Sequence, residues 1–160
     1  MILTSALLSL AAGVTVYSEE NSFDIEATGN TMDLIECWEN DDKAHTKVII
    51  YLANNPGRML TDLENGYFGE DISAIKFIFP TPTQSNNKWV NSLSANQQEE
   101  GCDDGFYSKC TYNLEDLDIN GKEVLALINR EIAADGIDAG KIFLAGHAQG
   151  GRMVYNVAFG

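Results

Sequence analysis

A glycine-rich segment near residue 148 holds the residue types whose spacing could do chemistry. It spells LAGHAQGG over residues 144–151. With a buried strand ending at Gly146 and a helix starting near Gly150, it has the form of the strand–turn–helix pattern G-x-S-x-G. The central residue of that pattern holds its side chain above a sheet, and the N–H of the next residue faces an oxyanion. The segment therefore predicts a nucleophile turn centred on Ala148, with the Gln149 N–H as an oxyanion donor.

The residue at the centre of this turn cannot be a nucleophile. Ala148 presents a methyl group where acyl transfer needs an activated hydroxyl or thiol. His147 beside it cannot act as a base on a methyl group, so we expect a packing role for it. Gly146, His147, Gly150 and Gly151 are thus predicted to build the turn without supplying its chemistry. A second interpretation stays open, in which the segment is a glycine-rich turn of another α/β fold that binds phosphate. The lysine of a P-loop and the G-x-G-x-x-G pattern are both missing.

Three apolar runs, at residues 47–52, 75–79 and 141–145, predict strands covered on both faces. A helix is predicted from Gly121 to about Asp135, ended by Gly136 and capped by Asp118 or Asn120. Its apolar stripe is Val124, Leu125, Leu127, Ile128 and Ile132. Buried strands that alternate with helices indicate an α/β fold with a mostly parallel sheet.

The N-terminal part of the chain alternates apolar and polar residues instead. Over residues 21–40 this alternation, around a turn at Thr28-Gly29-Asn30, predicts an antiparallel hairpin with one wet face. Residues 81–117 are polar and form a long excursion between the second buried strand and the helix. The predicted order therefore places the nucleophile turn after the last buried strand.

This arrangement resembles the phospholipase/carboxylesterase family of α/β-hydrolases, which includes the acyl-protein thioesterases. The segment IFLAGHAQGG is similar to the family's strand ending in G-F-S-Q-G-G, and a helix and a Gly136-Ile137-Asp138 turn precede it. FPTPT at residues 79–83 resembles the family's P-x-A-P segment, and Trp89 its following tryptophan. The similarity covers about residues 45–160. It implies an α/β-hydrolase fold incomplete at the C-terminus, an acyl-ester or lipid-like ligand, and no cofactor.

The sequence departs from the family pattern in three places. Ala148 replaces the serine. The segment Ala53-Asn54-Asn55 stands where the family has His-Gly, so the resemblance places the second oxyanion N–H at Asn55. The family's acid and histidine follow the turn's helix, beyond Gly160. We therefore expect that Gly160 is not a natural end, and that further residues or another polypeptide lie beside strand 141–145.

Two functions fit these observations. One is a catalytically inactive esterase-like domain that serves as a binding or structural module. The other is an active acyl-ester or thioester hydrolase of the carboxylesterase, thioesterase or lysophospholipase class, represented by an engineered Ser→Ala, truncated chain. The natural codon at position 148 would separate them.

Composition bounds the partners and the compartment. The formal net charge of −14 argues against nucleic-acid binding.

Residues 1–18 carry no charged side chain and look like a secretory signal, which predicts secretion. Residues 19–160 then form one domain. The alternative is that residues 1–18 are a buried N-terminal strand or helix. In a secreted protein, Cys102 and Cys110 are the expected disulfide and Cys37 is free or paired with another chain. No Cys/His spacing typical of zinc is present, so no metal site is predicted.

Overall fold

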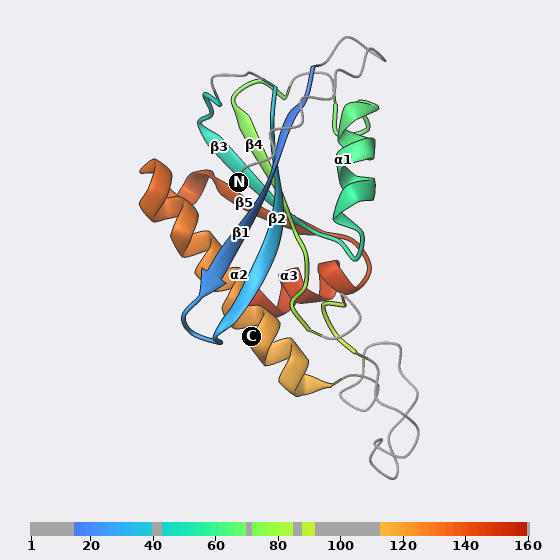
Figure 1. Cartoon of the computed structure of the whole chain (residues 1–160), viewed down its shortest axis with the longest axis vertical. Helices are drawn as coiled ribbons and strands as arrows, with labels where there is room; N and C mark the ends of the chain where they lie inside the picture. Colours follow the sequence, from blue (N-terminus) through green and yellow to red (C-terminus); the bar gives the residue numbers. More distant parts are fainter. Residues whose placement is uncertain (1–14, 40–42, 70–71, 85–87, 92–112, 160) are drawn as a thin grey trace.

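Five strands form one mixed sheet in the computed structural model, which describes residues 15–39, 43–69, 72–84, 88–91 and 113–159 (Figure 1). The order across the sheet is β1-β2-β4-β3-β5. Only β2 runs against the others, because it pairs antiparallel with both β1 and β4, whereas β3 pairs parallel with β4 and β5. The strands are β1 (Tyr17–Ile25), β2 (Asn30–Trp38), β3 (Lys47–Leu52), β4 (Ile75–Pro80) and β5 (Ile142–Gly146).

The predicted N-terminal hairpin is confirmed. Strands β1 and β2 pair from Tyr17↔Trp38 to Ile25↔Asn30, and the turn between them uses Gly29 at φ 72°, a left-handed conformation that glycine adopts freely. Strand β1 takes in the last two residues of the predicted signal, and Val16 just before it is buried. The last residues of the apolar N-terminal segment are therefore part of the folded sheet and its core.

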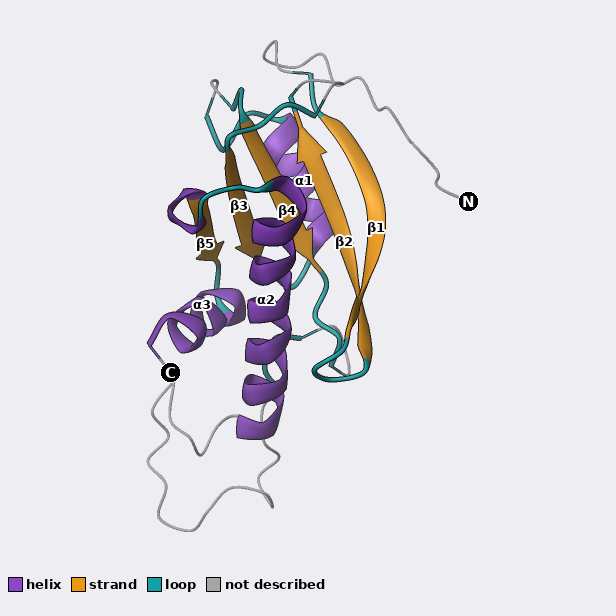
Figure 2. Ribbon diagram, turned by 90° about the vertical axis from the view of Figure 1, so that its left-hand side faces the viewer, coloured by secondary structure: helices purple, strands orange, loops and turns teal. Residues whose placement is uncertain are grey.

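Helices cover both faces of the sheet (Figure 2). Helix α1 (Pro56–Glu64) lies on one face, and α2 (Leu114–Asp135) and α3 (Gln149–Phe159) lie on the other. Each face has its own apolar core. Leu63 of α1 packs with Phe77 and Phe79 of β4, and Leu127 of α2 and Met153 of α3 pack with the opposite side of the sheet. The three layers confirm the predicted α/β class.

Helix α2 begins seven residues earlier than predicted. Its N-cap is Asn113, whose side chain accepts from the Glu115 N–H, so neither Asp118 nor Asn120 caps it. Gly121 suggested a helix start but lies inside the helix, where a Cβ would stand 3.2 Å from the Asn156 side chain of α3. The missing side chain thus serves a close contact between helices. The C-terminal end is as predicted, with Gly136 left-handed at φ 61°.

The stripe predicted for α2 needs one correction. Val124 and Leu127 are fully buried, but Leu125 is about half exposed. A 3-10 turn, η1 (Ala139–Lys141), then leads into β5, which starts one residue later than predicted.

Charged side chains cross-link α2 to the sheet. Lys76 of β4 lies 3.0 Å from Glu36 of β2 and 2.7 Å from Glu131 of α2, and Arg130 lies 2.6 Å from Glu36. Burial alone would raise the pKa of Glu36, but the charges of Lys76 and Arg130 lower it overall. Burial likewise works to lower the pKa of Lys76, and its contacts with Glu131 and Glu36 raise it overall. Both residues are therefore held in their charged forms.

Candidate functional site

The predicted strand–turn–helix is present. Strand β5 ends at Gly146, α3 begins at Gln149, and Ala148 between them has φ 53°. A non-glycine residue in this left-handed region is strained and persists only where the surroundings enforce it. The turn thus presents Ala148 in the manner of a nucleophile elbow, the sharp strand-to-helix turn of G-x-S-x-G sequences.

Backbone contact is what enforces the strain. A Cβ on Gly150 would lie 1.8 Å from the Leu52 carbonyl oxygen at the end of β3, and one on Gly146 would lie 2.6 Å from the Gly150 carbonyl. The His147 N–H donates to the same Leu52 oxygen at 3.1 Å. Both glycines are therefore required for the turn to seat itself on the end of the neighbouring strand.

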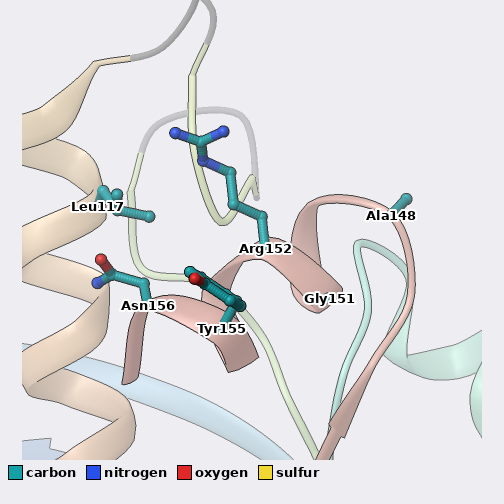
Figure 3. A pocket seen from close by; sticks show the side chains of 6 residues that line it. All are labelled: Leu117, Ala148, Gly151, Arg152, Tyr155 and Asn156. Carbon is teal, nitrogen blue, oxygen red and sulfur yellow. The ribbon is translucent and has the colours of Figure 1, made fainter. Parts of the chain in front are cut away.

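One cavity of about 600 Å³ opens on the α2 side of the elbow (Figure 3). Figure 3 shows Leu117 reaching toward it from α2, while Tyr155 and Asn156 approach from α3 and Ala148 stands at the bend ahead of that helix. A ligand lying in this cavity would touch the methyl group at the elbow. Its lining is Leu117, Ala148, Gly151, Arg152, Tyr155 and Asn156.

A second cavity, of about 460 Å³, lies on the α1 side of the elbow. His147 lines it from the elbow and Asn55 from the start of α1, so two residues that the sequence singled out share one hollow. His147 is exposed there, which corrects the expected packing role. The rest of the lining is Tyr51, Ala53, Asn54, Arg58, Met59, Asp62, Tyr67 and Phe68.

The turn that follows β3 is fixed by residues whose role the sequence did not reveal. Trp89 is fully buried and its Nε1 donates to the Ala53 carbonyl at 3.1 Å, while the buried Asn120 side chain donates to the Trp89 carbonyl at 2.7 Å. The Asn55 side chain accepts from the Arg58 N–H at 3.0 Å and so starts α1. An isolated tryptophan in a polar stretch was the one available signal. Through its bond to Ala53, Trp89 fixes the segment that contains Asn55, to which the resemblance assigns the second oxyanion N–H.

Cys37, the one cysteine among the described residues, does not line either cavity of this site. Cys102 and Cys110 lie outside the described residues. Cys37 is a free, buried thiol, and burial, followed by the charges of Glu64 and Glu36, raises its pKa. Within the described ranges, no group of three or more His, Cys, Asp or Glu side chains is placed to hold a metal ion. No helix in those ranges has the length and apolar character of a membrane span.

Comparison with solved structures defines the class of fold. A zinc-bound, cold-adapted esterase from an Arctic intertidal metagenomic library aligns with a TM-score of 0.51 at 12% identity, over 98% of this chain and 57% of its own. A protein described as a dienelactone hydrolase from Klebsiella pneumoniae aligns with a TM-score of 0.52 at 17% identity, over 90% and 55%. No model of a known protein family matches the sequence.

The chain therefore has an α/β-hydrolase fold, as predicted, and its nucleophile-type turn lies at the carboxyl end of β5. It spans a little over half the length of these two structures. This fold disfavours the interpretation of the glycine-rich segment as a phosphate-binding turn of another α/β fold.

Proposed function

We propose that this chain is an esterase-like α/β-hydrolase domain that binds acyl-ester or lipid-like ligands and does not hydrolyse them through the elbow. The observation that carries the proposal is Ala148. It keeps the strained backbone of a nucleophile position, at the edge of a 600 Å³ cavity, but presents only a methyl group. A ligand carbonyl above that methyl has no group to attack it, so binding and turnover are uncoupled.

The remaining parts of the elbow could still orient a carbonyl. In this proposal the Gln149 N–H, at the start of α3, and the Asn55 N–H, at the start of α1, face the carbonyl oxygen. Leu117 and Tyr155 would contact the acyl chain, because they line the cavity next to Ala148. Polarisation without a nucleophile would leave the ester intact.

Active-site labelling tests the proposal. The unaltered chain is mixed with a fluorophosphonate probe and, separately, with p-nitrophenyl butyrate. We expect no labelling at residue 148, no ester turnover above the buffer rate, and NMR shifts at Gly151 and Tyr155 from the intact ester. A hydroxyl can be introduced at the elbow by Ala148→Ser. The matched control is Gln149→Ser, which places the hydroxyl one residue further along the chain. Stoichiometric labelling of the unaltered chain at the elbow would contradict the proposal.

The intact elbow also favours a second candidate, an active acyl-ester or thioester hydrolase in which residue 148 is naturally serine. Turnover by Ala148→Ser, but not by Gln149→Ser, in a protein that also contains residues beyond Gly160 would support that candidate, because the resemblance places the catalytic acid and histidine there. In that enzyme a histidine beyond Gly160 would take the serine proton, the serine oxygen would attack the acyl carbonyl, and the alcohol or thiol would leave with that proton to give an acyl-enzyme.

We further propose that another strand covers the free side of β5, supplied by the same protein or by another polypeptide. Within the described residues, β5 pairs with β3 alone. Phe143 is half exposed, and Tyr155 and Phe159 of α3 are more exposed still. An open apolar edge favours strand pairing between chains. Sedimentation should show self-association of the chain that Phe143→Lys suppresses, and a strictly monomeric chain at high concentration would argue against it.

Secretion and a Cys102–Cys110 disulfide remain part of the proposal. N-terminal sequencing of protein from the culture medium and non-reducing peptide mapping test them. An intact Met1 in the mature protein, or free thiols at both positions, would overturn the respective claim.

A further inference from the structure

Acidic residues are absent from the two segments that build the elbow region. None of the 24 Asp and Glu residues falls within residues 43–61 or 139–160, although these segments hold five of the 10 Lys and Arg residues and both histidines. The first segment contains β3 and the start of α1, and the second contains β5 and α3. Because β3 pairs with β5, the two segments lie side by side. In a chain with a net charge of −14, these two segments therefore carry a local excess of positive charge, which favours an anion.

The helix ends in this region share the same bias. The first turns of α1 and α3 carry no acidic residue, whereas the first turn of α2 carries Glu115 and Asp116. The N-terminus of a helix has a partial positive charge, which an acidic side chain in the first turn offsets. The partial positive charges of α1 and α3 therefore remain available to a ligand, whereas Glu115 and Asp116 offset that of α2.

Arg58 supplies a full positive charge in the lining of the cavity beside His147. Its side chain is 75% exposed, and its one ion pair among the described residues is a 3.9 Å contact with Asp62, one turn further along α1. Such an exposed, long pair is weak and leaves most of the guanidinium's five N–H donors available. The side-chain amides of Asn54 and Asn55 and the hydroxyl of Tyr67 line the same cavity.

We propose that this cavity is an anion-binding subsite. Arg58 binds a carboxylate or phosphate group of the ligand there, and His147 and Asn54 donate further hydrogen bonds. The subsite deepens the proposed function, on which it rests: the acyl part of the ligand lies beside Ala148 and its anionic part lies beside Arg58. Ala148 lines the first cavity and His147, its neighbour in the chain, lines the second, so the proposal places one ligand across the elbow. The ligand class is then an acyl compound that carries a negative charge.

Titration of the full chain with inorganic phosphate and with acetate, followed by amide NMR, tests the subsite and distinguishes the two groups. We expect saturable shifts at residues 54, 55, 57, 58 and 147–149 that sodium chloride does not reproduce. The tighter-binding anion identifies the group. Arg58→Gln should weaken binding about tenfold, since a hydrogen bond to a charged group is lost. Asp62→Asn should tighten binding, because it removes the competing carboxylate.

Lys122→Gln is the matched control. It makes the same change in net charge on the exposed side of α2, where Lys122 pairs with Asp118 at 2.6 Å, and should leave anion binding unchanged. Equal weakening by Lys122→Gln and Arg58→Gln, or shifts no different from those of chloride, would overturn the subsite. Ester binding without anion binding removes only the subsite. Anion binding with labelling of the unaltered chain removes only the proposed function.

Discussion

The elbow and the charged layer beneath α2 both join distant parts of the sheet, but they use different groups. At the elbow the backbone does the joining, through the packing of Gly150 on the Leu52 carbonyl and the His147 N–H bond to that same oxygen. Beneath α2 the joining is done by side chains, because Lys76 bridges Glu36 and Glu131 in a buried position.

This difference shows where function can lie. Buried charges that pair with one another are committed to holding α2 in place, and a perturbed pKa there reports structure. At the elbow the backbone fixes the geometry, so side chains such as His147 and Arg58 stay exposed to a ligand. The candidate site therefore combines a constrained backbone with side chains that remain available to a ligand.

The largest expected effect comes from Gly150→Ala. Its Cβ would lie 1.8 Å from the Leu52 oxygen, a backbone atom that cannot move without separating α3 from β3. We expect a loss of at least about 4 kcal/mol in the free energy of unfolding, at the upper end of single-substitution effects. Urea denaturation followed by circular dichroism measures it.

Gly57→Ala is the control, since its Cβ meets only the Asn55 side chain at 3.6 Å and the residue lies in the first turn of α1. It should be neutral or stabilising by up to about 1 kcal/mol. Equal stability of the two variants would mean that the elbow does not pack on β3 as described.

Removal of the buried lysine should come next. Lys76→Met leaves Glu36 and Glu131 buried without their shared cation, and we expect a loss of about 3 kcal/mol or more in the free energy of unfolding. Lys122→Met breaks an exposed pair of similar length and should cost less than about 1 kcal/mol. If the two losses were equal, the layer beneath α2 would have to be accessible to water.

Of these two regions, the sequence predicted the elbow but not the charged layer beneath α2. The pattern G-x-x-x-G-G lies within one short turn, so the turn and its glycines were predicted correctly. Lys76 looked like an ordinary polar residue at a strand end, because its partners lie on two other elements, 40 and 55 positions away along the chain. Charge partners that only the fold brings together leave no local signal.

The same reason explains the two features that were misassigned or missed. The start of α2 was placed at Gly121 because glycine usually marks a helix boundary, whereas here it allows contact with Asn156. Trp89 was noted only through the resemblance, since its hydrogen bond to Ala53 spans 36 positions. Long-range contacts decide both.

Acidification should weaken the charged layer by a smaller amount. The pKa of Glu36 is lowered in the folded chain, so its contribution to stability is complete above the pKa of an unfolded Glu, about 4.3, and is lost as the pH falls through the lower folded value. The stability difference between the unaltered chain and Glu36→Gln should therefore shrink below about pH 4.3. A difference that stays constant from neutral pH to below that range would show that Glu36 is not held charged by Lys76 and Arg130.

The smallest expected effect concerns the strained residue itself. Ala148 sits at φ 53°, where its Cβ crowds the following carbonyl, and Gly136 sits at φ 61° at the end of α2, with open space where a Cβ would lie. Exchange of the two residue types should therefore act in opposite directions: Ala148→Gly should raise the free energy of unfolding by about 1 kcal/mol, and Gly136→Ala should lower it by about the same amount. Equilibrium denaturation of both variants measures the two changes in stability.

A stabilised Ala148→Gly chain would mean that the elbow retains a strained residue at a cost in stability, as expected of a position kept for its place at a ligand site. If Ala148→Gly were instead as destabilising as Gly136→Ala, the alanine methyl would have to make a packing contact that outweighs the strain, and the cavity would be closed at that point.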